Sequence, residues 1–250
     1  MGEVSTAGSG VGARVRRKED DRLLRGRGRF VGDIALVGMK ELAFVRSPVA
    51  HATITGIEIP EEHRGAVFTW ADLAAGGVKP IRAVSGLPGF KVSEQPALAD
   101  GKVRFVGEPV AVCVAATRAE AEDIAASVFV DYAELPVNSD MLEAVTPGAP
   151  KVHDHWPDNV FLETNVGGNI AEIAATAPVK VSRTIRTARQ CMVPLEGKGV
   201  VAHWDRHVEQ LVLTTSTQMP HIVRAGLSEC LDLDQGLIRV VAPDVGGGFG

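Results

Sequence analysis

The sequence has few cysteines, and they stand far apart. Its 250 residues include Cys113, Cys191 and Cys230, none of which belongs to a CxxC motif. Zinc ribbons and cysteine-ligated iron–sulfur clusters are therefore not encoded in this chain. The odd number of cysteines suits a reducing compartment, and the N-terminus lacks the apolar stretch of an export signal. These features predict a cytoplasmic location.

Aromatic residues and long apolar runs are also scarce. Aromatics make up 5% of the chain, which argues against a stacking surface for single-stranded nucleic acid. The longest apolar run, 109–116, is far shorter than the roughly 20 residues of a membrane-spanning helix. With 45% hydrophobic residues and a net charge of −5, the chain can still fill a core. We expect a globular protein with no nucleic acid partner and no membrane insertion.

The N-terminal region carries an excess of positive charge. Residues 14–29 contain eight arginines or lysines against three acidic residues, although the whole chain is acidic. Such a basic arm can bind nucleic acid, a partner protein, or the acidic remainder of its own chain. The overall acidity and the shortage of aromatics argue against nucleic acid, and both docking interpretations stay open.

The clearest local unit is a strand, a helix and a second strand between residues 103 and 135. Apolar residues occupy both faces of 110–115, which predicts a strand covered on both sides. Thr117 and Glu120 have the spacing of a capping box, and an apolar stripe at helical spacing follows them. Residues 129–132 then lead into another strand.

Period-two patterns and a proline-started helix describe the rest of the chain. Strands are predicted at 40–47, 52–59, 66–69, 179–186, 199–204, 210–216 and 237–242, and a helix at 220–231. Glycine and proline content divides the chain into parts. These parts are a flexible tail (1–20), a first domain (21–145), a linker (146–160) and a second domain (161–250).

Two places offer candidate binding chemistry. Gln218 ends a predicted strand just before the helix that starts at Pro220, and strand ends of this kind face the ligand crevice of α/β proteins. Its amide suits an oxo or carbonyl oxygen, although a helix cap or an exposed polar residue is an equal alternative. Residues 246–250 form a glycine-rich segment after the last predicted strand. They lack the remaining glycine and the helix of a dinucleotide fingerprint.

Other polar clusters are weaker candidates. His153, Asp154 and His155 lie in a proline-rich loop, where solvent exposure or capping is a better explanation than metal binding. Glu196 follows Pro194 and Leu195, and it is interpreted as the carboxylate of a surface turn. No catalytic residue and no metal ligand is assigned in this chain.

Several motifs, taken in order, resemble the large subunits of molybdenum hydroxylases, the family of xanthine dehydrogenase, aldehyde oxidase and aerobic carbon monoxide dehydrogenase. The segments that carry the resemblance are 17–30, 45–52, 105–111, 194–197, 216–221 and 241–250. The resemblance implies an α+β fold: an a/b hammerhead domain followed by an incomplete mixed α/β molybdopterin-binding domain. The turn at 194–198 departs from the family's usual Glu-Pro-Arg-Gly pattern.

The resemblance also implies a cofactor and partners. Gln218 matches the family glutamine that contacts the oxygens of the molybdenum centre, and Gly247, Gly248 and Phe249 match a loop whose backbone lies against the molybdenum–molybdopterin cofactor. FAD and 2Fe-2S clusters are expected on a medium and a small partner subunit. The substrate expected for the family is an aldehyde, an N-heterocycle or a CO-like molecule.

The family pattern continues beyond the glycine-rich segment. We therefore expect a truncated or split large subunit, which needs the remaining large-subunit polypeptide to hold the cofactor and to turn over substrate. The alternative is a non-catalytic remnant or subunit-interaction module of the same fold.

Overall fold

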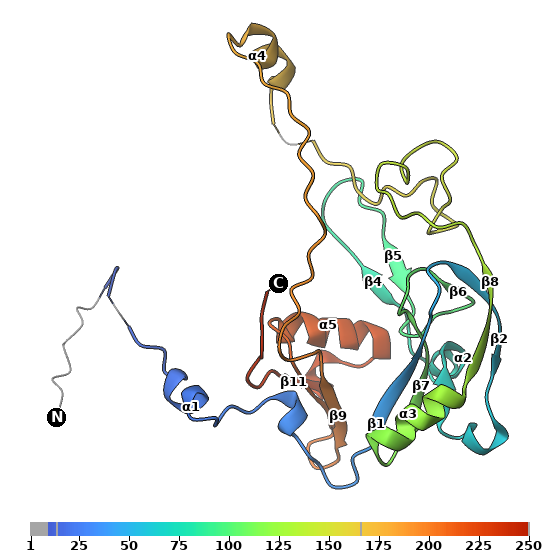
Figure 1. The fold of residues 1–250 in the computed structure, drawn as a ribbon. Helices are drawn as coiled ribbons and strands as arrows, with labels where there is room; N and C mark the ends of the chain where they lie inside the picture. Colours follow the sequence, from blue (N-terminus) through green and yellow to red (C-terminus); the bar gives the residue numbers. More distant parts are fainter. Residues whose placement is uncertain (1–9, 14, 166, 250) are drawn as a thin grey trace. The chain divides into compact units, whose positions relative to one another are not determined.

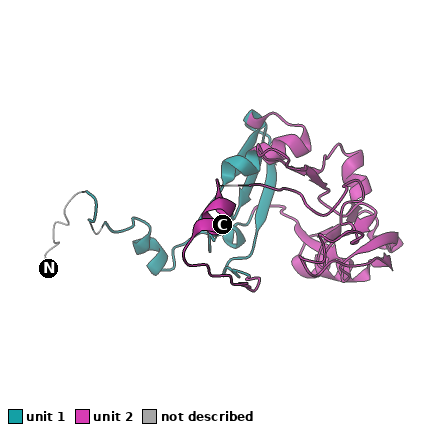
Figure 2. Ribbon diagram, turned by 90° about the horizontal axis from the view of Figure 1, so that it is seen from above, with its two compact units in different colours: residues 1–35, 191–224, 236–250 teal, residues 36–190, 225–235 magenta. Residues whose placement is uncertain are grey.

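The computed structural model describes residues 10–13, 15–165 and 167–249. The chain forms two compact units, which Figure 2 shows in two colours. One comprises residues 1–35, 191–224 and 236–250, and the other comprises 36–190 and 225–235. Residues 1–9 and 14 of the predicted flexible tail lie outside the described residues.

The larger unit contains two three-stranded antiparallel sheets (Figure 1). One has the order β1 (Glu41–Arg46), β7 (Pro109–Ala115), β3 (Val67–Thr69), and the other has β6 (Lys102–Val103), β2 (Ala52–Glu58), β8 (Phe129–Glu134). A small hairpin pairs β4 (Ile81–Ala83) with β5 (Ser93–Gln95). The helices and the short 3-10 turn of this unit are η2 (Glu61–His63), α2 (Trp70–Ala75), α3 (Arg118–Ser127) and α4 (Ile170–Thr176). The strands predicted at 40–47, 52–59 and 66–69 are confirmed.

The predicted strand–helix–strand unit is confirmed as β7, α3 and β8, although the two strands belong to different sheets. The capping box forms as expected. The Glu120 backbone N–H donates to Thr117 Oγ1 at 3.2 Å, and the Thr117 N–H donates to Glu120 Oε2 at 3.1 Å. The apolar stripe of α3 packs on a core cluster that includes Val67, Cys113 and Val128. Burial of this stripe stabilises α3 on the sheet.

The cover over β7 is less complete than the sequence predicts. Cys113, on one face, is fully buried. On the other face, Val112 and Val114 are only partly buried, beside Leu42 and Phe44 on β1, which are 50% and 43% exposed. An apolar strand pattern therefore marks two faces suited to burial, but only one of them is fully covered here.

The smaller unit is built around a sheet with the order β11 (Ile238–Val241), β10 (Gln210–Thr215), β9 (Val200–Asp205). β9 and β10 form an antiparallel hairpin, whereas β10 and β11 are parallel. The chain passes from β10 to β11 through α5 (Pro220–Leu231), whose residues are shared between the units, and η3 (Gln235–Leu237). The N-terminal elements are α1 (Asp20–Leu24) and η1 (Val31–Asp33). The helix and three strands predicted after residue 198 are confirmed, within one residue at each end.

The strand predicted at 179–186 is wrong. The structure has no helix or strand between α4 and β9, and Val179, Val181 and Ile185 are 77%, 80% and 83% exposed. Alternating apolar residues form a strand only where another strand satisfies the backbone hydrogen bonds. The sequence pattern carries no information about such a partner.

The observed architecture is a set of small sheets with a few short helices, which confirms the α+β class predicted from the sequence. Among the described residues, none of the helices has the length and apolar character needed to cross a membrane.

Candidate functional site

Two loops meet beyond the parallel strands of the smaller unit. Gln218 follows the end of β10, and Gly246–Phe249, here called the glycine bend, follows β11. Parallel pairing places the carboxyl ends of both strands at the same edge of the sheet, the usual place for a ligand in such sheets. A Cβ atom added to Gly248 would lie 2.8 Å from Oε1 of Gln218. The structure therefore brings Gln218 and Gly248 into direct contact.

Each glycine of the bend has a different close neighbour. A Cβ on Gly247 would lie 2.6 Å from Cβ of Pro194, and the backbone there has a φ of +148°, a conformation that favours glycine. A Cβ on Gly246 would overlap Cβ of Glu196. Phe249 is 60% exposed. Residues 246–248 therefore pack closely on their neighbours. The contacts at Gly246 and Gly247 leave no room for a side chain, whereas the neighbour of Gly248 is the flexible end of Gln218.

Glu196 holds the glycine bend through its carboxylate. The N–H of Gly246 donates to Oε2 at 2.6 Å, and the N–H of Val31 donates to Oε1 at 3.3 Å. The backbone N–H of Glu196 also donates to the carbonyl of Gly246 at 3.4 Å. The sequence interpretation of Glu196 as a surface carboxylate missed these contacts. The only feature of the sequence that could have indicated this role of Glu196 is the unusual sequence of its turn.

Asp244 makes a second set of contacts just before the bend. Both terminal nitrogens of Arg22 donate to its two carboxylate oxygens, and the N–H of Arg29 donates to Oδ2 at 2.8 Å. The N–H of Asp244 donates back to the carbonyl of Arg29 at 3.0 Å. Hydrogen bonds from the Arg22 guanidinium, and then from the Arg29 backbone, lower the pKa of Asp244 to about 2. The carboxylate is therefore charged at neutral pH.

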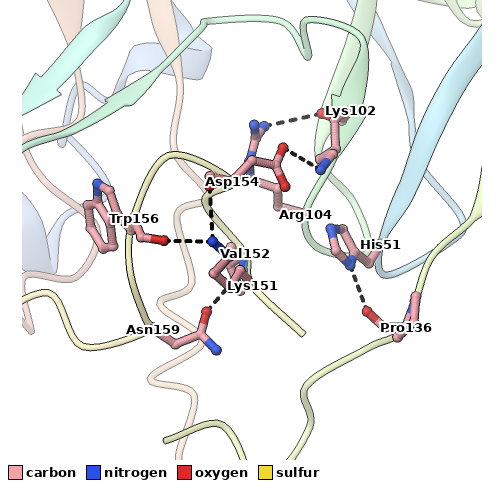
Figure 3. A network of polar contacts seen from close by, with 9 residues as sticks. All are labelled: His51, Lys102, Arg104, Pro136, Lys151, Val152, Asp154, Trp156 and Asn159. Carbon is pink, nitrogen blue, oxygen red and sulfur yellow. Dashed lines mark hydrogen bonds and ion pairs between the residues drawn. The ribbon is translucent and has the colours of Figure 1, made fainter. Parts of the chain in front are cut away.

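The loop that carries His153, Asp154 and His155 has a structural role, and Figure 3 shows Asp154 of this loop beside Lys102. Asp154 pairs with Lys102 at 2.6 Å, and the His153 ring lies against the indole of Trp156 with centroids 4.4 Å apart and the planes tilted by 39°. Burial, followed by the positive charge of Arg104, lowers the pKa of His153. Within the described part of the chain, no three His, Cys, Asp or Glu side chains form a group that could hold a metal ion. The pair of Asp154 and Lys102 joins this loop to β6 of the same unit.

The same loop is held by its own backbone and side chains. Asn159 Oδ1 accepts the N–H of Val152 at 3.0 Å, and Lys151 Nζ donates to the carbonyl of Trp156 at 3.0 Å. Trp156 is only 8% exposed. Figure 3 shows these contacts near His51, whose Nδ1 lies 2.7 Å from the carbonyl oxygen of Pro136.

Comparisons with known proteins give two family matches in sequence order. Residues 25–136 match the a/b hammerhead domain of aldehyde oxidase and xanthine dehydrogenase, and residues 152–250 match the molybdopterin cofactor-binding domain. The chain is 39% identical to the nicotine 6-hydroxylase large subunit of Paenarthrobacter nicotinovorans, covering 96% of this chain and 30% of the relative. It is 34% identical to the carbon monoxide dehydrogenase large chain of Hydrogenophaga pseudoflava, covering 97% and 32%.

A solved structure agrees with these matches. Quinoline 2-oxidoreductase from Pseudomonas putida 86 superimposes with a TM-score of 0.86 at 39% identity, covering 94% of this chain and 30% of that one. The fold and the two domain matches thus define a class, the molybdopterin-dependent hydroxylases. Within that class, the chain belongs to the large-subunit family and corresponds to its N-terminal part. It spans about a third of the length of the curated relatives that it matches.

The residues at the sheet edge fit a molybdenum–pterin group. Residues 246–248 of the glycine bend offer backbone without side chains, Phe249 offers an exposed ring, and Gln218 offers an uncharged amide beside them. Neither supplies an anionic ligand for a metal, which suits a metal that arrives already bound to its own organic ligand.

Proposed function

We propose that this chain acts as the N-terminal part of the large subunit of a molybdopterin-dependent oxidoreductase. In this proposal Gln218, Gly247, Gly248 and Phe249 contact the molybdenum–molybdopterin cofactor. The observation that carries it is the contact between the Gln218 side chain and the glycine bend at the carboxyl ends of two parallel strands. The match of residues 152–250 to a molybdopterin cofactor-binding domain supports the same assignment.

The roles of these residues follow from their chemistry. The Gln218 amide both donates and accepts hydrogen bonds without adding charge, so it would hold and orient an oxygen of the bound group while leaving the charge of the site unchanged. The glycines let the bend pack closely on Glu196, Pro194 and Gln218, and this packing fixes the backbone that would lie against the cofactor. When bound, the group supplies the redox chemistry that hydroxylates a substrate with oxygen derived from water.

The whole protein's activity and assembly follow as part of the proposal. The substrate is an aldehyde, an N-heterocycle or a CO-like molecule. Two of the relatives at 39% identity are named for nicotine and quinoline, which favours an N-heterocycle. Catalysis requires the part of a large subunit that corresponds to the remaining two thirds of those relatives. FAD on a medium subunit and 2Fe-2S clusters on a small subunit carry electrons away, in the cytoplasm. Relatives described as a large chain and as a complex subunit support this assembly.

The test is metal analysis of the assembled protein. The chain is co-expressed with the products of its flanking genes in cells that make molybdopterin, and it is purified through a tag on this chain. We expect near-equimolar molybdenum by mass spectrometry and none bound to the chain purified alone. Absence of molybdenum in every combination would overturn the proposal and favour the non-catalytic alternative.

Matched variants test the assigned residues. Gln218→Ala should lower the molybdenum content of the assembled protein, whereas Gln190→Ala, a substitution at an exposed glutamine outside any helix or strand, should leave it unchanged. Equal molybdenum content in both variants would remove Gln218 from the proposed site.

A further inference from the structure

The basic arm predicted from the sequence contacts the smaller unit's own acidic residues. Arg22 pairs with Asp244 through both terminal nitrogens, and the backbone of Arg29 exchanges two hydrogen bonds with Asp244. The side chain of Asp244 is 16% exposed and that of Arg22 is 41% exposed, so the pair is partly shielded from water. Of the interpretations left open for the arm, the structure therefore supports docking on its own chain.

A second contact lies at Val31, two residues after the end of the arm. Val31 is 5% exposed, and its N–H donates to Glu196. Its side chain also packs on Gly199, where an added Cβ would lie 3.1 Å from Cγ1 of Val31. The other oxygen of the same carboxylate accepts the N–H of Gly246. Glu196 therefore links the arm to the first residue of the glycine bend.

We propose that Glu196 and Asp244 are positioning residues that use the N-terminal arm to fix the backbone of the glycine bend. We call Arg22, Arg29, Val31, Glu196 and Asp244 the bend clasp. This inference rests on the proposed function, because fixing the bend matters for chemistry only where the bend contacts the cofactor.

The physical need for the clasp comes from the glycines. A run of three glycines loses more conformational freedom on ordering than any other three residues, so a bend of this sequence is poorly ordered without external contacts. The clasp supplies charge-assisted hydrogen bonds immediately before the bend, at Asp244, and at its first residue, Gly246. The turn that holds Glu196 is itself tight, since Val193 has a φ of +36°, which is rare for a β-branched residue.

The first test uses the 250-residue chain without cofactor. The N–H of Gly246 should exchange slowly with solvent and should resonate downfield in the NMR spectrum of the wild-type chain, because it donates to a carboxylate. In Glu196→Ala that exchange should become roughly tenfold faster. Glu209→Gln, at an exposed glutamate in the β9–β10 turn, is the control and should change neither signal. Fast exchange of Gly246 in the wild-type chain would overturn the clasp, whatever the variants do.

The second test uses the assembled protein and measures cofactor rather than turnover. Glu196→Gln and Arg22→Gln should lower retention of molybdenum by roughly 10- to 100-fold, the range typical of outer partners of metal sites. They should also alter the electron paramagnetic resonance signal of the metal that remains. Arg27→Gln, at an exposed arginine on the same arm, is the control.

The outcomes separate the two proposals. Absence of molybdenum from the wild-type assembly overturns the proposed function. Molybdenum in the wild type, with wild-type retention and signal in Glu196→Gln and Arg22→Gln, overturns the clasp alone. If Glu196→Ala fails to fold, Glu196→Gln, which keeps the side-chain length, carries the variant test.

Discussion

Alanine substitutions in the glycine bend separate its structural requirement from its binding role. In Gly248→Ala, the new Cβ would lie 2.8 Å from Oε1 of Gln218, the far end of a flexible side chain. Gln218 can rotate away at about 0.5–1.5 kcal/mol, and loss of glycine entropy in the unfolded chain returns about 0.4–1 kcal/mol. The free energy of unfolding should therefore change by no more than about 1.1 kcal/mol. The displaced Gln218 should nevertheless lower the molybdenum content of the assembled protein.

Gly247→Ala, in contrast, should lower the free energy of unfolding strongly. Its φ of +148° costs an alanine on the order of 1–3 kcal/mol. The contact with Pro194, where the Cβ would lie 2.6 Å away, adds about 1–3 kcal/mol of overpacking, since a proline ring cannot rotate aside. We expect a total destabilisation of about 2–6 kcal/mol, the sum of those two ranges.

The assay is urea unfolding of each variant, with Gly226→Ala as the matched control. Gly226 lies within α5 and has open space around its Cβ position, so alanine should stabilise the chain by about 0.5–1 kcal/mol. If Gly248→Ala were as unstable as Gly247→Ala, the contact with Gln218 would be rigid and the argument refuted. Wild-type molybdenum content in Gly248→Ala would refute the binding role.

Three further predictions concern charge, thiol reactivity and local stability. Because the pKa of Asp244 is lowered to about 2, its contribution to stability is complete above its unfolded pKa near 3.8 and is lost as pH falls through 2. Urea unfolding of Asp244→Asn and wild type should converge over that range, and a constant difference would contradict it. Burial raises the pKa of the Cys113 thiol, whereas Cys191 is exposed. An alkylating reagent followed by mass spectrometry should therefore show Cys191 labelled first, and equal labelling of the two thiols would contradict this prediction. Amide exchange should be slower in 103–132 than in 150–250, since most buried hydrophobic residues precede residue 130, and equal protection would contradict it.

The sequence predicted the elements whose signals are local. The capping box at Thr117 and Glu120, the apolar stripe of α3 and the proline at the start of α5 are all patterns within a single helix, and each is confirmed. The strand predicted at 179–186 fails because its evidence was also local, whereas a strand requires a distant partner. Strand formation therefore depends on information that this segment does not contain.

The candidate site also has residues that the sequence identified and residues that it missed. Gln218 and the glycine bend were found because their motifs resemble those of a family, and their contact follows from parallel pairing of β10 and β11. The role of Glu196 was missed because its partner, Gly246, lies 50 residues away and the spacing carries no signal. Asp244 and Arg22 are 222 residues apart. Long-range ion pairs of this kind are specified by the fold and become visible only in the structure.

The three consecutive glycines show why composition alone misleads. By sequence, such a run is typical of a flexible loop, since glycine restricts the backbone least. In the structure, each position instead has a different close neighbour: Glu196 at Gly246, Pro194 at Gly247 and Gln218 at Gly248. The first two leave no room for a side chain. A loop that needs glycine for space rather than for freedom can be held rigid, and rigidity is what a cofactor-binding backbone requires. The contacts of Glu196 with Gly246 then matter as much to the proposed site as Gln218 itself.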